Sequence, residues 1–101
     1  MRFDQGVNIW EKGQKPTCVY FVMAGLVSNT SNGRVYIKGQ MVGQDEIMFK
    51  QERRYSLRSL TECLTMKLER DVFEKILKDY PDIQFKLLEE AEFRRVATIG
   101  D

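Results

Sequence analysis

The sequence contains no histidine and only two cysteines, Cys18 and Cys63, which lie far apart in the chain. Without histidine, a hydrolytic triad that uses an imidazole base is excluded, and the usual spacings of a zinc site are absent. Both cysteines lie in apolar segments, which favours buried, reduced thiols over a disulfide. Because no nucleophile is paired with a base, we expect a domain without catalysis of its own and without a metal.

The net charge is small, and the sequence has no long apolar run. Sixteen Lys and Arg against fifteen Asp and Glu leave a net charge of +1, which argues against a broad nucleic-acid footprint. No apolar run is long enough to span a bilayer, and no signal peptide opens the chain. With 101 residues, 43% of them apolar, we expect one small globular domain or part of one. We expect it to be cytosolic and not to insert into a membrane itself.

Short apolar segments between turn residues predict a meander of strands. The longest segment runs from Cys18 to Ala24, and its Val, Tyr and Phe residues favour a buried strand over a helix. We expect Leu26 and Val27 to continue this strand. The dipeptide Asn32-Gly33 predicts a hairpin, because both residues tolerate positive φ. Further strands are expected in residues 3–10 and 34–38, from Leu57, and across the alternating Leu64, Met66 and Leu68.

The hydrophobic period changes from that of strands to that of helices near the C-terminus. Pro81 separates two helical segments, since proline ends one helix and is tolerated in the first turn of the next. The first segment carries apolar residues at helical spacing, namely Val72, Phe73, Ile76, Leu77 and Tyr80. In the second, one stripe is formed by Leu88, Ala91, Arg95 and Ile99.

The segment from Val42 to Ser59 has the residues of a pocket for one phosphate. Gly43 lets the backbone approach a ligand closely, and a short helix over residues 45–49 would point free N–H groups at an anion. Arg53 or Arg54 could then return a planar, permanently charged fork to the same anion. The spacing alone leaves open a polar loop with two solvated arginines.

This segment resembles the phosphate-binding cassette of cyclic nucleotide-binding domains, in which a Phe-Gly-Glu motif, a helix-sized gap and an arginine followed by small residues occur in that order. The stretches F-x-x-G-V-x-I-x-x-x-G, V-Y-F-V-M-A-G-L-V and K-G-Q-M-V-G-Q are similar to the family's strand-glycine-strand rhythm. The resemblance implies a mainly β fold, a jelly-roll-like β-roll with a cassette helix and a C-terminal lid helix. It also implies cAMP or cGMP as the ligand and no cofactor.

The resemblance assigns roles to five cassette residues. Gly43 would be the cassette glycine and Arg53 the phosphate-binding arginine. Gln44 replaces a glutamate that accepts a hydrogen bond from the ribose 2′-hydroxyl, so ribose recognition should be weakened. The backbone N–H groups of Asp45 and Glu46 could face the phosphate, but the family prefers apolar or small residues there, and two carboxylates would repel a phosphate unless they point outward.

Three further positions bear on the pocket. Arg54, where channels often carry threonine, would either strengthen the attraction for phosphate or point to solvent. Tyr55 replaces a small alanine, so its ring would crowd the pocket. Arg95, on the lid helix, could cap the purine or be a charge at the end of a helix. Four aromatic residues are expected in the core rather than against a base, namely Tyr20, Phe21, Phe73 and Phe85.

The resemblance predicts a regulatory cyclic nucleotide sensor. The helices that normally precede the first strand are missing, so residues 1–101 are expected to be a single domain excerpted from a larger protein. Through that protein the domain could be part of a homo-oligomer. The segments E-R-D-V-F-E-K-I-L-K-D-Y-P-D and R-R-V-A-T-I-G are similar to those of cation channels, which favours a channel or transporter as effector, with a kinase regulatory subunit second. The alternative is a degenerate domain that binds no nucleotide and serves as a protein-interaction or assembly module.

Overall fold

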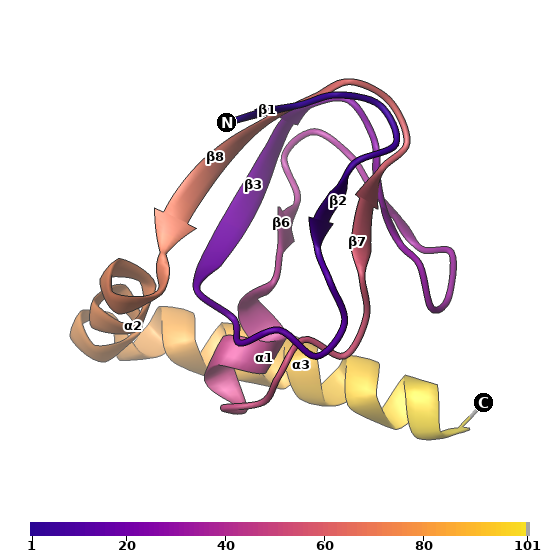
Figure 1. Cartoon of the computed structure of the whole chain (residues 1–101). Coiled ribbons are helices and arrows are strands. Elements are labelled where there is room, and N and C mark those ends of the chain that lie inside the picture. Colours follow the sequence, from indigo (N-terminus) through magenta and orange to yellow (C-terminus); the bar gives the residue numbers. More distant parts are fainter. Residues whose placement is uncertain (101) are drawn as a thin grey trace.

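The computed structural model describes the backbone of residues 1–100 and the side chains of residues 1–94. Within them, two four-stranded antiparallel sheets face each other as a roll, and helices close one end (Figure 1). One sheet has the order β1-β8-β3-β6 and the other β2-β7-β4-β5. The strands are β1 (Arg2–Phe3), β2 (Asn8–Trp10), β3 (Cys18–Ala24), β4 (Val27–Asn29), β5 (Val35–Tyr36), β6 (Met41–Val42), β7 (Leu57–Ser59) and β8 (Cys63–Glu69), and the helices are α1 (Gln44–Met48), α2 (Arg70–Asp79) and α3 (Pro81–Gly100). The expected mainly β fold with C-terminal helices is confirmed.

Strand β3 forms over the predicted residues and pairs with β8 along most of its length. The prediction that Leu26 and Val27 continue it is wrong. Gly25 has φ +86, and a Cβ there would lie 2.4 Å from the carbonyl oxygen of Glu62, so the backbone turns at this glycine. Val27 therefore begins β4, which belongs to the other sheet.

The main core lies between the two sheets. Trp10 stacks on Tyr20 there, with ring centroids 6.2 Å apart. A second cluster joins the outer face of β3 to α1 and α2, and it consists of Val19, Ile47, Phe73 and Leu77. The predicted core positions of Tyr20 and Phe73 are confirmed and Phe21 is half-buried, but the prediction for Phe85 is wrong, because its side chain on α3 is 70% exposed. Both cysteines are free and buried, as expected.

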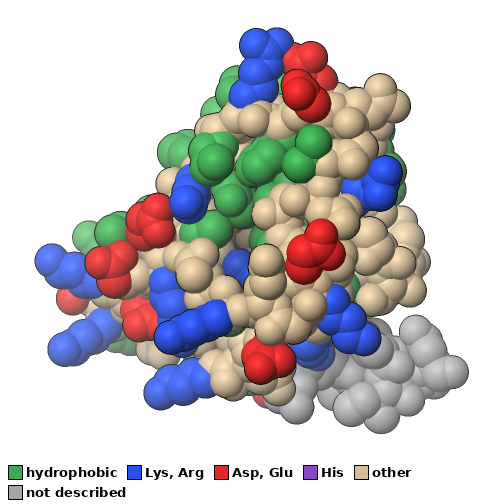
Figure 2. Space-filling view, in the orientation of Figure 1, with side chains coloured by type: hydrophobic (Ala, Val, Ile, Leu, Met, Phe, Trp, Pro, Cys, Tyr) green, Lys and Arg blue, Asp and Glu red, His purple; other side chains and the backbone are tan. Residues whose placement is uncertain are grey.

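Some apolar side chains of the strands lie on the outer surface of the roll and are exposed. The predicted Asn32-Gly33 hairpin joins β4 to β5, and the positive φ falls on Gly33 alone. Leu64 and Met66 alternate in β8 as predicted, but both point outward and are exposed. Figure 2 shows apolar side chains gathered over the strands, whereas charged ones of both signs surround the helical end.

Helix α3 begins at Pro81, as predicted, and crosses the open end of the roll beside α1 (Figure 1). Within the predicted stripe, Ala91 is buried and Leu88 half-buried, while the side chains of Arg95 and Ile99 lie outside the described residues. Among the described residues, no helix combines the length and the apolar character that crossing a membrane requires.

Candidate functional site

The candidate site is centred on Gly43, which directly precedes the five-residue helix α1. Its φ of +100 is unfavourable for other residues. A Cβ at this position would also lie 3.0 Å from the Nη1 atom of Arg53 and 3.0 Å from the indole ring of Trp10. Both the backbone angle and the lack of space therefore require glycine here.

Arg53 turns inward from this glycine and lies inside the protein, with a side chain 2% exposed. Its Nη1 atom donates to the carbonyl oxygen of Gly43 at 2.7 Å, and its Nη2 atom donates to that of Cys18 at 2.6 Å. The guanidinium also lies over the ring of Trp10, 3.8 Å from the centroid, which is a close cation–π geometry. Arg53 thus links the cassette to Trp10 of β2 and to Cys18 of β3.

Glu46 supplies the counter-charge of Arg53. Its Oε1 atom lies 3.2 Å from Nη1 of Arg53, and its side chain is 1% exposed. Burial raises the pKa of the Glu46 carboxyl above its usual range, and the charge of Arg53 opposes this shift without cancelling it. Glu46 therefore points inward rather than outward, and it balances the charge of the arginine that the sequence assigned to phosphate.

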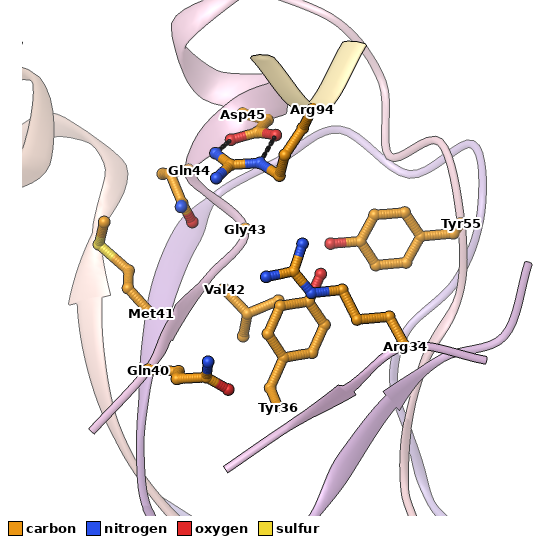
Figure 3. Close-up of a pocket in the computed structure, with 10 residues that line it drawn as sticks. All are labelled: Arg34, Tyr36, Gln40, Met41, Val42, Gly43, Gln44, Asp45, Tyr55 and Arg94. Atoms are coloured by element: carbon orange, nitrogen blue, oxygen red, sulfur yellow. Dashed lines mark hydrogen bonds and ion pairs between the residues drawn. The ribbon is translucent and has the colours of Figure 1, made fainter. Parts of the chain in front are cut away.

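A small cavity of about 50 Å³ lies beside the cassette, and neither Arg53 nor Glu46 is among the residues that line it. Its walls come from β5, β6, the start of α1, the approach to β7, and α3, and its lining residues are Arg34, Tyr36, Gln40, Met41, Val42, Gly43, Gln44, Asp45, Tyr55 and Arg94 (Figure 3). Ligand pockets for small molecules usually have about 300–1,000 Å³. The cavity has room for water but not for a nucleotide unless its walls move.

Two tyrosines fill much of this region. The half-buried ring of Tyr55 packs against Trp10, with centroids 5.7 Å apart. Burial, the largest cause, raises the pKa of Tyr55, and a hydrogen bond with Tyr36 acts in the same direction. The Tyr55 ring therefore occupies the space that the family's small alanine would leave open.

An ion pair closes the cavity on the side of α3. The Nε atom of Arg94 donates to Oδ2 of Asp45 at 2.9 Å, and the Nη2 atom donates to Oδ1 at 2.5 Å, a two-point contact drawn in Figure 3. The hydrogen bonds that Arg94 donates to the Asp45 carboxylate raise the pKa of Arg94. We name this Asp45–Arg94 pair the clasp; it joins the cassette helix to the last helix.

Outside the cavity, a wider groove of about 640 Å³ runs between the β4–β5 hairpin and α3. It shares part of its wall with the cavity, including Arg34 and Tyr55, and adds Arg54 and the exposed Phe93. Arg54 therefore lines the groove and is separate from Arg53, which lies in the interior.

The seven predicted site residues fall into four groups. The cavity is lined by Gly43, Gln44 and Asp45. Glu46 and Arg53 lie buried behind it, Arg54 lines the groove, and the side chain of Arg95 lies outside the described residues. Sequence reasoning missed two cationic side chains, Arg34 and Arg94. The only signal for them was their position beside the Asn-Gly turn and on the last helix.

Residues 1–80 match the family model described as the cyclic nucleotide-binding domain. The chain belongs to this family. The resemblance drawn from the cassette and from the strand-glycine rhythm is thereby confirmed.

Relatives of this cyclic nucleotide-binding domain occur within much longer proteins. It is 23% identical to lysophospholipase nte1 of Neurospora crassa over 109 aligned residues, which cover 100% of this chain and 7% of the fungal protein. Among solved structures, the regulatory subunit of a cAMP-independent protein kinase A from Trypanosoma brucei matches with a TM-score of 0.76 and 21% identity, over 97% of this chain and 38% of that one. The EAL enzyme Bd1971, bound to cAMP and cyclic-di-GMP, matches with a TM-score of 0.79 and 17% identity, over 99% and 29% of the two chains. These structures share the fold.

Proposed function

We propose that this cyclic nucleotide-binding domain is a regulatory part of a larger protein, and that it binds a cyclic purine nucleotide with micromolar or weaker affinity. The observation that carries the proposal is the cassette geometry, in which Gly43, Gln44 and Asp45 line one wall of a cavity that α3 covers. Family membership supports the ligand class. The small share of the curated relatives that the chain spans supports a larger parent protein.

The size of the cavity couples binding to the position of α3. A nucleotide needs more room than about 50 Å³, and α3 is the wall that the clasp joins to the cassette, with Ala91 and Leu87 packed beneath it. A ligand that binds only when α3 shifts has different affinities for the two positions of this helix, which is the requirement for regulation. The helix would then transmit binding to an attached effector.

For the class of effector, two observations point in different directions. The sequence around Tyr80-Pro81-Asp82 resembles cation channels, whereas the relatives found include lysophospholipases and a kinase regulatory subunit. We therefore propose an effector domain without choosing among channel, transporter, kinase and lipase. Assembly through the parent protein stays a prediction.

Calorimetric titration with cAMP and with cGMP tests the proposal. A saturable heat with either nucleotide, matched by a rise in the melting temperature, is the expected result. No heat and no thermal shift at millimolar concentrations of both would reject it. The second candidate, an assembly module that binds no nucleotide, would then stand, and the burial of Arg53 and the filling of the pocket by Tyr55 are the observations that favour it.

Replacing Gln44 with glutamate should tighten nucleotide binding by about 1 kcal/mol, or about fivefold, because a charge-assisted hydrogen bond to ribose is stronger than a neutral one. Gln44 lines the cavity and is almost fully buried. The matched control is Gln51→Glu, which adds the same charge on the exposed loop after α1. Unchanged or weaker affinity in the Gln44 variant would mean that this side chain does not face the ribose.

A further inference from the structure

The groove between the β4–β5 hairpin and α3 is richer in hydrogen-bond donors than in acceptors. Among the described residues that line it, three are arginines, namely Arg34, Arg54 and Arg94, and one, Asp45, is a carboxylate. An arginine side chain carries five N–H donors and no acceptor. Both carboxylate oxygens of Asp45 already accept from Arg94. The groove therefore favours a ligand group that presents acceptors.

The base of a bound nucleotide is the group that this groove would receive. Gln44, which we expect to meet the ribose, lines the small cavity, and the groove shares Arg34 and Tyr55 with that cavity. With about 640 Å³, the groove has the size of a site for a small molecule. A purine attached to the ribose would therefore extend into the groove, toward the exposed ring of Phe93.

Arg34 lies where the cavity and the groove meet. It follows the turn of the β4–β5 hairpin, and Figure 3 shows its guanidinium pointing into the cavity. Its central carbon lies 5.0 Å from the ring centroid of Tyr36, so the aromatic ring supports the planar guanidinium from one side. Glu89 and Glu90 of α3 line a neighbouring hollow together with Arg34, yet none of the ion pairs formed within the described residues involves Arg34.

Guanine and adenine differ at the edge that an arginine contacts. Guanine presents two adjacent acceptors, O6 and N7, to which a guanidinium donates two parallel hydrogen bonds, whereas adenine presents the N7 acceptor beside its N6 donor. With adenine, the second N–H group of the arginine would face another donor. A guanidinium at the edge of the base therefore favours guanine.

We propose that Arg34 donates to the O6 and N7 atoms of a guanine base in the groove, so that the domain binds cGMP more tightly than cAMP. This inference rests on the proposed function and names its preferred ligand. The ribose and the phosphate are the same in the two nucleotides, so the preference isolates the contact with the base.

The test is calorimetric titration of the whole chain with cGMP, cAMP and cIMP, which keeps the O6 and N7 atoms of guanine but lacks its amino group. The wild type should bind cGMP and cIMP at least about fivefold more tightly than cAMP, the lower end of what a two-point arginine contact contributes. Arg34→Gln should weaken binding of cGMP and cIMP by about the same factor. Its affinity for cAMP should be unchanged or higher, because a glutamine amide matches the adjacent donor and acceptor of adenine.

Two further variants separate the contact with the base from the effect of charge. Arg34→Lys keeps the charge but loses the planar pair of donors, so it should keep only part of the preference. Arg58→Gln, the same change as Arg34→Gln at an exposed position on β7 outside the groove, should leave all three affinities unchanged. An unchanged melting temperature without ligand confirms that each variant is folded.

Three results would overturn the inference alone. A wild type that binds cAMP at least as tightly as cGMP would show that the groove does not select guanine. An Arg34→Gln variant that keeps the wild-type preference would assign the selection to another side chain. An equal loss for all three nucleotides would place Arg34 against the shared ribose or phosphate. In each case the domain still binds nucleotide and the proposed function stands, whereas a wild type that binds none of the three removes the proposed function together with this inference.

Discussion

Arg53→Met should lower the free energy of unfolding at neutral pH by about 3–5 kcal/mol, the usual loss when one partner of a buried ion pair is removed. The variant leaves the Glu46 carboxylate buried without its counter-charge, and it leaves the carbonyl oxygens of Gly43 and Cys18 without their donor. Urea denaturation measures the change. Arg54→Met, on an exposed neighbour in the groove, should change stability by less than about 0.5 kcal/mol.

The pH dependence of the variant's stability tests how much of this loss comes from Glu46. Burial already raises the pKa of its carboxyl, and removal of Arg53 should raise it further. A carboxyl whose pKa is higher in the folded state stabilises fully below its unfolded pKa of about 4.3 and loses that contribution as the pH rises through the folded pKa. The destabilisation should therefore be smaller at acidic than at neutral pH. Adding Glu46→Leu to Arg53→Met should recover much of the stability. A loss of stability that is the same at acidic and neutral pH, and that Glu46→Leu does not reduce, would contradict this account.

Much of the fold could be predicted because it follows from local pattern. Cys18–Ala24 is a continuous apolar run rich in Val, Tyr and Phe, and Pro81 is disfavoured inside a helix but tolerated in its first turn. The turn at Gly25 could not be predicted in this way. It depends on the carbonyl of Glu62, which the fold brings against it from a distant part of the chain.

The site was less predictable, because its decisive contacts depend on the direction of side chains. The spacing of Gly43 and Arg53 is that of the family cassette, but Arg53 points inward and pairs with Glu46, a charge where the family prefers apolar or small residues. On α3, Arg94 and Arg95 differ by 100° around the helix axis. The apolar stripe of α3 is weak, so the sequence does not determine which of these two arginines faces the cassette. The contact of Arg94 with Asp45 therefore became visible only in the structure.

Removal of the Asp45–Arg94 clasp should increase local unfolding of α3 more than that of any other part of the fold. Asp45→Asn removes the charge from a two-point, partly buried contact with Arg94, and hydrogen bonds to charged groups contribute about 1.5–3 kcal/mol. Amides of residues 88–94 should therefore exchange with deuterium at least about tenfold faster, whereas those of β3 should not change. Asp4→Asn, the same substitution at an exposed position near β1, is the control.

The same variant shows whether the clasp opposes or assists the ligand. If the closed position of α3 excludes nucleotide, only molecules with α3 in the open position bind it, and the apparent dissociation constant is the intrinsic one divided by the open fraction. Asp45→Asn increases the open fraction, so it should tighten binding of cAMP in parallel with the faster exchange. Arg94→Gln should act in the same direction, because it removes the other half of the pair. Faster exchange combined with weaker binding would instead mean that the clasp is kept around the bound ligand. In that case α3 would act as a lid closed over the nucleotide, and the room for it would have to come from Tyr55 and the β4–β5 hairpin.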